Sequence, residues 1–157
     1  MRLVLYQPDI PQNAGAMMRL AACLALPLEL IEPCGFVLSD RRLRRAGMDY
    51  LDHLQLTRHA SYAAFAAWRQ SQVPGARLLL LTTRGERSHL EFGFHPDDLL
   101  MVGRETAGVP EEVHAGASAR LRIPIAPGRR SLNVALAAAM VLGEALRQTG
   151  LFPGNGG

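Results

Sequence analysis

The sequence contains no lysine: all 17 of its basic residues are arginine, and with 14 acidic residues they give a formal net charge of +3. A GC-rich genome would explain this bias, and so would a function that needs guanidinium groups. The charge is unevenly spread, because Arg41, Arg42, Arg44 and Arg45 fall close together in the stretch SDRRLRRAG. Such a cluster can bind phosphate through charge and paired hydrogen bonds, or it can be a solvated surface turn.

Cysteine and long apolar runs are also scarce. Cys23 and Cys34 lack metal-ligand spacing, and two cysteines cannot form a disulfide scaffold for a chain of this length, so we expect both thiols to be reduced and structural. The longest uncharged apolar run, residues 134–143, is about half of the roughly 20 residues that span a bilayer. The N-terminus lacks the long apolar region of a signal peptide. We therefore expect a cytoplasmic protein without a membrane segment.

Three common ligand-binding or catalytic patterns are missing as well. The five histidines share no metal-ligand spacing, no serine lies in a G-x-S-x-G turn, and the G-x-G-x-x-G fingerprint of dinucleotide-binding folds does not occur. We expect no metal site and no hydrolase triad. A polar cluster of His89, His95, Asp97 and Asp98 is conceivable, although a surface loop explains these residues more simply.

What the sequence does contain is a regular alternation of strand-like and helix-like segments. A composition of 48% hydrophobic and 20% charged residues is that of a folded globular protein, and residues 1–157 suit a single domain with 151–157 as a flexible tail. We predict strands at 2–6, 28–31, 53–57, 77–82, 99–102 and 120–123, and helices at 13–26, 39–46, 61–70, from 110, and 131–148. This order predicts an α/β fold with a mostly parallel sheet and flanking helices. The strand at 77–82 is apolar without alternation, so it should be internal and covered on both faces.

Loops that follow strands are where such a fold binds ligands, because the carboxyl ends of parallel strands share one edge of the sheet. Three loops stand out: QPDIPQNAGAMMR at 7–19, VGRETAGVPEE at 102–112 and PIAPGRRS at 124–131. In the second, Gly103 follows a strand directly and leaves room for a ligand beside the backbone. In the third, two prolines preclude a regular strand, and Ser131 is predicted to cap the next helix.

Arg19 lies on the helix that follows the first loop, among alanines and methionines that offer few polar neighbours. A solvent-facing arginine is one explanation. The last helix, from Ser131, is rich in small residues, which suits close packing in a core and also close approach of a second copy of itself.

Together the three loops resemble the motifs of the SPOUT superfamily of S-adenosyl-L-methionine-dependent RNA methyltransferases. PQNAGAMMR is similar to the first motif, LMVGRETAGVP to the second and IPIAPGRRSLNVALAAAM to the third, in the same order. The stretches LYQPDIPQNAG, IEPCGF, RRLRRAGMDY and LTTRG resemble the small single-domain members, which methylate the ribose 2′-oxygen of the wobble nucleotide of tRNA.

The resemblance implies features that composition and periodicity do not. It implies a deep C-terminal trefoil knot, S-adenosyl-L-methionine bound at the knot without a metal, a homodimer in which the knot regions pack together, and the tRNA anticodon stem-loop as the partner. Matching positions assign cofactor contacts to Leu81, Gly103, Ile123 and Ser131. They place Arg19 near the target ribose, where we expect it to act by charge and positioning, since a guanidinium rarely gives up a proton.

Candidate phosphate contacts are Arg41, Arg42, Arg44, Arg45 and Arg130. Ala135, Leu136 and Gly143 depart from polar or aromatic residues common in the third motif of relatives. Methylation of another tRNA or rRNA nucleotide, and a non-catalytic RNA-binding role, therefore stay open as alternatives. A nucleotide-binding α/β domain unrelated to methyl transfer is a third alternative, but it leaves the three motifs unexplained.

Overall fold

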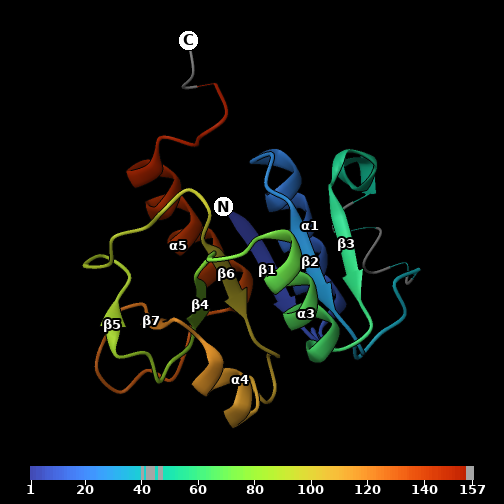
Figure 1. Ribbon diagram of the computed structural model, residues 1–157. Helices are drawn as coiled ribbons and strands as arrows, with labels where there is room; N and C mark the ends of the chain where they lie inside the picture. The colour runs from blue at the N-terminus through green and yellow to red at the C-terminus, as the bar shows by residue number, and fades with distance from the viewer. Residues whose placement is uncertain (40, 42–44, 46–47, 155–157) are drawn as a thin grey trace.

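Seven strands form one sheet in the order β3-β2-β1-β6-β4-β7-β5, with every pairing of these strands parallel (Figure 1). The computed structural model describes residues 1–39, 41, 45 and 48–154. The strands are β1 (Arg2–Tyr6), β2 (Leu28–Ile31), β3 (Leu56–His59), β4 (Leu78–Leu81), β5 (Arg87–Ser88), β6 (Leu99–Val102) and β7 (Ala119–Arg122). The helices are α1 (Pro11–Cys23), the short 3-10 helix η1 (Met48–His53), α3 (Tyr62–Gln72), α4 (Glu111–Gly116) and α5 (Val134–Thr149). The predicted α/β fold with a parallel sheet is confirmed.

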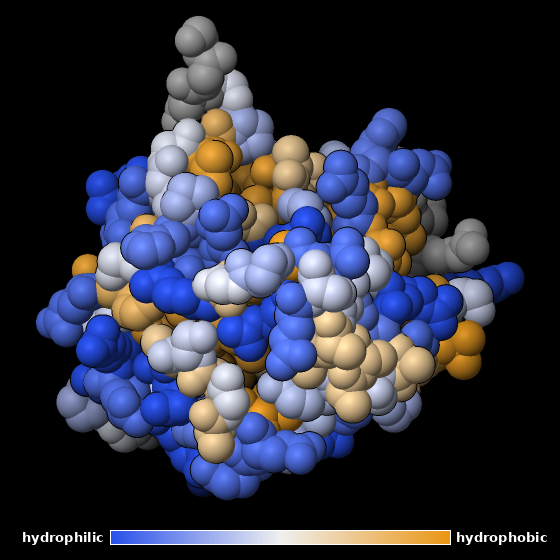
Figure 2. All heavy atoms as spheres, in the orientation of Figure 1, coloured by the Kyte–Doolittle hydropathy of each residue, from blue (hydrophilic) through white to orange (hydrophobic). Residues whose placement is uncertain are grey.

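Helices cover both faces of the sheet, and alternate strand residues serve the two layers. Leu3 and Leu5 of β1 pack in the core that contains α1 and α5, whereas Val4 and Tyr6 pack in the core that contains Phe65 of α3. Figure 1 shows α1 and α5 behind the sheet and α3 and α4 in front of it. On the front face, drawn in Figure 2, most surface side chains are hydrophilic.

Strand β4 is internal, as its unbroken apolar run predicts. It pairs with β6 on one side and β7 on the other. Leu79 lies in the core of α1 and α5, and Leu78 and Leu80 lie in the core of α3 and α4. A strand covered on both faces needs no polar alternation, which is why four consecutive leucines fit here.

Helix α1 begins and ends earlier than the sequence predicts. Pro11 occupies the start of the helix, where its missing N–H costs nothing, and the capping position is Ile10 rather than Asn13. The helix ends at Cys23 because Leu24 leaves the helical conformation and Ala25 adopts a left-handed φ of 52°. Asn13 therefore lies within the first turn, where its side chain is available for another contact.

Helix α5 starts three residues later than predicted. Its cap is Asn133, whose Oδ1 accepts hydrogen bonds from the amides of Ala135 (2.9 Å) and Leu136 (3.3 Å), so the capping role predicted for Ser131 is wrong. The helix stops at Gly150, which adopts a left-handed φ of 70°. Within the described parts of the chain, no helix has both the length and the apolar character that crossing a membrane requires.

Other boundaries also move. The strand predicted at 53–57 lies at Leu56–His59, because the preceding residues form η1. The polar stretch before β6 contains the short strand β5. Of the predicted helix at 39–46, only Ser39, Arg41 and Arg45 are within the described residues, and of the predicted tail only 151–154 are.

The loop after β4 crosses β7 at very close range. A Cβ atom on Gly85 would lie 2.3 Å from the carbonyl carbon of Leu121 and 2.6 Å from the amide nitrogen of Arg122. Backbone therefore meets backbone, and only glycine fits. The trefoil knot that the family resemblance implies stays a prediction.

Candidate active site

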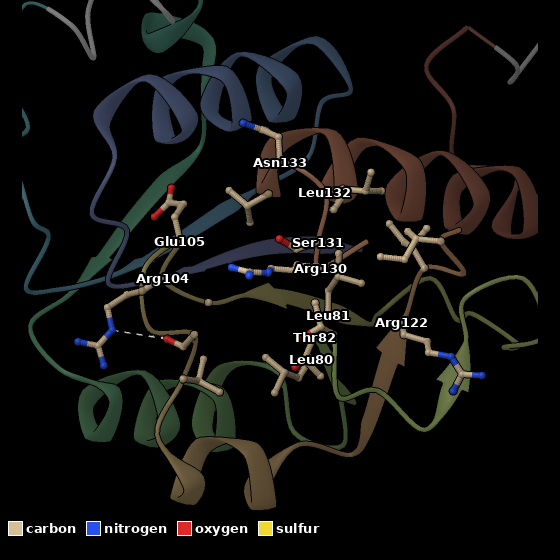
Figure 3. Close-up of a pocket in the computed structure, with 18 of the residues that line it drawn as sticks. Leu80, Leu81, Thr82, Arg104, Glu105, Arg122, Arg130, Ser131, Leu132 and Asn133 are labelled. Carbon is tan, nitrogen blue, oxygen red and sulfur yellow. Dashed lines mark hydrogen bonds between the residues drawn. The ribbon is translucent and has the colours of Figure 1, made fainter. Parts of the chain in front are cut away.

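A cavity of about 760 Å³ lies beyond the carboxyl ends of β4, β6 and β7 (Figure 3). Its walls come from residues 80–83 after β4, from the loop 103–109 after β6, and from 122–134 between β7 and α5. All four predicted cofactor contacts, Leu81, Gly103, Ile123 and Ser131, line this one cavity. The sheet brings them together because β6, β4 and β7 are neighbours, although they lie far apart in sequence.

The lining combines an apolar part with hydroxyl and amide groups. Leu80, Leu81, Val109 and Ile123 supply hydrocarbon surface, and neutral polar groups come from Thr82, Thr83, Ser131, Asn13 and Asn133. Glu105 and the arginines at 104, 122, 129 and 130 line the cavity as well. A cavity of this volume, with apolar walls and placed polar groups, is typical of sites for small organic ligands. The residues present therefore fit a ligand that carries a heteroaromatic base together with polar and charged parts.

Gly103 is required by the loop itself. A Cβ atom there would lie 2.9 Å from the carbonyl carbon of Gly108 and 3.1 Å from Cγ1 of Val109. The loop closes on itself through hydrogen bonds between Arg104 and Gly108, with N–O distances of 3.1 and 2.9 Å. The returning chain thus fills the direction in which a side chain would point, so the loop requires glycine here, and Gly103 itself lines the cavity.

Arginines surround the cavity but point in different directions. Arg122 turns away and donates hydrogen bonds to the carbonyl oxygens of Gly85 (3.0 Å) and Glu86 (2.9 Å). Arg104 lies outside, with its guanidinium carbon 5.6 Å from the centre of the Tyr6 ring. Among the arginines labelled in Figure 3, Arg130 is the one that extends into the cavity.

Asn13 and Asn133 join α1 to α5 at the cavity wall. Nδ2 of Asn133 donates a hydrogen bond to Oδ1 of Asn13 at 3.0 Å, across 120 residues of sequence. Neither was among the predicted site residues. The sequence carries a signal for both, because Asn13 lies in the first conspicuous loop, where a side-chain amide can approach a ligand, and Asn133 follows Ser131 by two residues.

A second pair, Asp9 and Glu105, joins the first loop to the loop after β6. The amide of Asp9 donates to Oε2 of Glu105 and the amide of Glu105 donates to Oδ1 of Asp9, both at 3.1 Å. Burial, together with the neighbouring Asp9 carboxylate, raises the pKa of Glu105 above its ordinary value. Hydrogen bonds from the Glu105 side chain and the Thr106 hydroxyl lower the pKa of Asp9. Sequence reasoning missed this pair, because no spacing rule links positions 9 and 105.

The other predicted site residues that the structure describes, Arg19, Arg41 and Arg45, do not line the cavity. Arg19 is exposed on α1, and its guanidinium carbon lies 4.8 Å from the centre of the Tyr50 ring in η1. It is not among the residues that line the cavity. Arg41 and Arg45 are exposed, and Arg42 and Arg44 lie outside the described residues.

The described residues contain no group of three or more histidine, cysteine, aspartate or glutamate side chains placed to hold a metal ion. Cys23 and Cys34 are both free. Burial raises the pKa of Cys34 to about 11, so its thiol stays protonated near neutral pH.

The model of the SpoU rRNA Methylase family matches residues 1–143. The chain belongs to this family. A relative from Beijerinckia indica, a tRNA (cytidine(34)-2'-O)-methyltransferase, is 61% identical over 148 residues, which cover 94% of this chain and 91% of that protein. The resemblance to RNA methyltransferases drawn from the three motifs is thereby confirmed.

Solved structures of methyltransferases share this fold. One, described as "Structural insights into the 2-OH methylation of C/U34 on tRNA", has a TM-score of 0.88 and 48% identity, with 94% of each chain covered. The SpoU methyltransferase AviRb from Streptomyces viridochromogenes, solved with the cofactor AdoMet, has a TM-score of 0.86 and 27% identity over 94% of this chain and 60% of that longer one.

Proposed function

We propose that this protein is an S-adenosyl-L-methionine-dependent methyltransferase that methylates the ribose 2′-oxygen of the wobble nucleotide, cytidine or uridine 34, of tRNA. The observation that carries the proposal is the single cavity into which the residues of the second and third motifs converge, in a chain 61% identical to a tRNA (cytidine(34)-2'-O)-methyltransferase. One domain carries this activity.

Different cavity residues contact different parts of the cofactor in this proposal. S-adenosyl-L-methionine supplies, when bound, a methyl group activated by a cationic sulfonium, and S-adenosyl-L-homocysteine is the product. Leu81 and Ile123 offer the apolar slot for adenine, and the Ser131 hydroxyl and nearby backbone amides offer hydrogen bonds. The tight loop that Gly103 permits forms the opposite wall. The protein needs no metal for this chemistry.

Arg19 is the catalytic residue in this proposal. A guanidinium favours the negative charge that develops on the 2′-oxygen and binds the neighbouring phosphate, while the proton leaves to phosphate or water. The ring of Tyr50, 4.8 Å away, restrains the guanidinium by a cation–π contact.

Arg41, Arg42, Arg44, Arg45 and Arg130 are the proposed phosphate contacts for the anticodon stem-loop. Arginine suits this task because its planar fork pairs with phosphate oxygens. Arg130 extends from the cavity wall, which supports contact with the phosphate nearest the reacting ribose.

We propose a homodimer in the cytoplasm, packed through α5. Leu136 and Met140 are exposed and lie four residues apart in α5, so they form an apolar stripe on the side of the helix that the sheet does not cover. Leu132, just before the helix, is exposed as well. Arg19 is absent from the lining of its own cavity. A second copy packed on α1 and α5 resolves both observations, because Arg19 of one protomer then serves the cavity of the other.

The first test is transfer of a labelled methyl group from S-adenosyl-L-methionine to tRNA from a strain that lacks this modification, followed by nuclease digestion. Label at the wobble ribose supports the proposal. Label at another nucleotide would keep the chemistry and reject the substrate, and no label from protein that binds the cofactor would favour the non-catalytic alternative.

The shared site has its own test in mixed dimers. Arg19→Ala lacks the arginine and Gly103→Val lacks the cavity, so each homodimer should be inactive. After random mixing of subunits, half of the dimers would carry one complete site, and about a quarter of wild-type activity should return. No recovery in dimers shown to have exchanged subunits would place both residues in the same protomer's site.

A further inference from the structure

Asp9 lies where three loops meet. It belongs to the loop between β1 and α1, exchanges two hydrogen bonds with Glu105 in the loop after β6, and accepts a third from the Thr106 hydroxyl. On its other side it touches the loop after β2: a Cβ atom on Gly35 would lie 2.8 Å from Cα and Cβ of Asp9, and the Gly35 amide donates to the Pro8 carbonyl oxygen at 2.9 Å.

The partner in this contact is part of the cavity wall. Glu105 lines the cavity, and its Oε1 is buried without a hydrogen-bond partner in the part of the chain described. The loop's own backbone hydrogen bonds run between Arg104 and Gly108, and the Arg104 guanidinium contacts the Tyr6 ring of β1. Among the described residues, the hydrogen bonds that attach this loop to the first loop are those of Asp9.

We propose that Asp9 is a positioning residue for methyl transfer, which holds the loop 103–108 and the Glu105 carboxyl group against the first loop and so fixes one wall of the cofactor cavity. This inference rests on the proposed function, because its experiment measures cofactor binding and methyl transfer. Asp9 is outside the cavity lining and acts only through Glu105 and Thr106.

The charges support a persistent contact. Two ionised carboxylates so close together would repel each other, but the pKa of Glu105 is raised and that of Asp9 is lowered, so the pair can hold one proton and one negative charge. A carboxylate acceptor also makes stronger hydrogen bonds to an amide and a hydroxyl than a neutral oxygen does.

The experiment measures binding of S-adenosyl-L-homocysteine by calorimetry, and kcat and KM for methyl transfer, in Asp9→Ala, Asp9→Asn and the control Asp97→Ala. Asp97 is exposed and outside the cavity lining. In Asp9→Ala the Kd and the cofactor KM should rise about tenfold, the scale of one lost charge-assisted hydrogen bond. In Asp9→Asn both should stay within about threefold of wild type, because the amide oxygen still accepts from the Glu105 amide.

Two outcomes would overturn the proposal: binding by Asp9→Ala that matches wild type, or a loss in Asp9→Asn as large as in Asp9→Ala. If Asp9→Ala does not fold, Asp9→Ser replaces it, because a serine side chain is too short to reach the Glu105 amide. Wild-type protein that binds the cofactor but methylates no tRNA would reject the proposed function and leave the binding comparison valid.

Discussion

The two helical layers of this protein expose different kinds of side chain on their outer surfaces. Helix α3 buries Phe65 against the sheet and exposes Ala63, Ala64 and Ala67 together with polar residues near its end, so its outer side presents small or polar side chains. Helix α5 buries a similar inner side, yet on its outer side Leu136 is 62% and Met140 48% exposed. An amphipathic helix has all its apolar side chains buried once one side is covered, whereas α5 has apolar side chains on two sides. This exposed apolar side of α5 is the surface on which we propose that a second copy of the chain packs.

The two layers also differ in their polar and charged groups. Asn13 and Arg19 lie on α1 and Asn133 caps α5, and both asparagines line the cavity. The α3 side has its own buried polar group, in which Glu29 lies 2.9 Å from Arg2 and 2.7 Å from His59, with Trp68 stacked nearby. Glu29 and His59 are buried, Arg2 is partly exposed, and none of the three lines the cavity, so we expect this group to serve stability.

The largest expected effect tests the α1 side. Arg19→Ala should lower turnover by at least about a hundredfold, because one lost electrostatic contact to the developing charge has that scale, while cofactor affinity stays unchanged. Arg84→Ala, an exposed arginine paired with Glu111 near α4, is the matched control. Methyl transfer at saturating tRNA measures both, and turnover in Arg19→Ala equal to that of the control would remove Arg19 from the mechanism.

The exposed stripe of α5 is tested by the pair Leu136→Glu and Met140→Glu. Charges in an apolar interface should give a monomer in sedimentation, and methyl transfer should be lost with the dimer. The matched pair on the other layer is Ala63→Glu and Ala67→Glu, also four residues apart on an exposed helix side. If both double variants sediment alike, the contrast between the layers has no bearing on assembly.

The buried group on the α3 side should affect stability without affecting chemistry. Glu29→Ala leaves Arg2 and His59 without their carboxylate, and we expect the free energy of unfolding to fall by about 3 kcal/mol. Urea unfolding measures this loss, with the exposed Glu91→Ala as control. Activity per folded molecule should be unchanged, and a selective loss of kcat would contradict a purely structural role.

The smallest expected effects come from replacing the side chains that cap α3 and α5, Ser61 and Asn133. Ser61 accepts one hydrogen bond, from the Ala64 amide at 3.1 Å, so Ser61→Ala should cost about 1 kcal/mol of stability and nothing else. Asn133→Ala removes a similar cap and also the contact with Asn13, so it should weaken cofactor binding as well. Thermal unfolding and calorimetric binding of S-adenosyl-L-homocysteine, measured on both variants, separate the two cases.

Much of the fold could be predicted from local patterns. The apolar run of β4 and the serine before α3 act through neighbours in sequence, so their elements appear where expected or within a few residues. Boundaries shifted where two candidate caps competed, as with Ser131 and Asn133, because only the tertiary position of the chain decides which side chain meets the free amides.

The sequence alone determined the parallel α/β architecture, the three loops that could bind a ligand and, through their motifs, the family. The tertiary structure alone decided that Asp9 and Glu105 exchange hydrogen bonds and that Arg19 is absent from the cavity lining. The physical reason is the distance in sequence between the residues involved. Helix and strand patterns depend on residues a few positions apart. Contacts between loops join segments separated by up to about a hundred residues, and the packing of the whole sheet decides which of these segments meet.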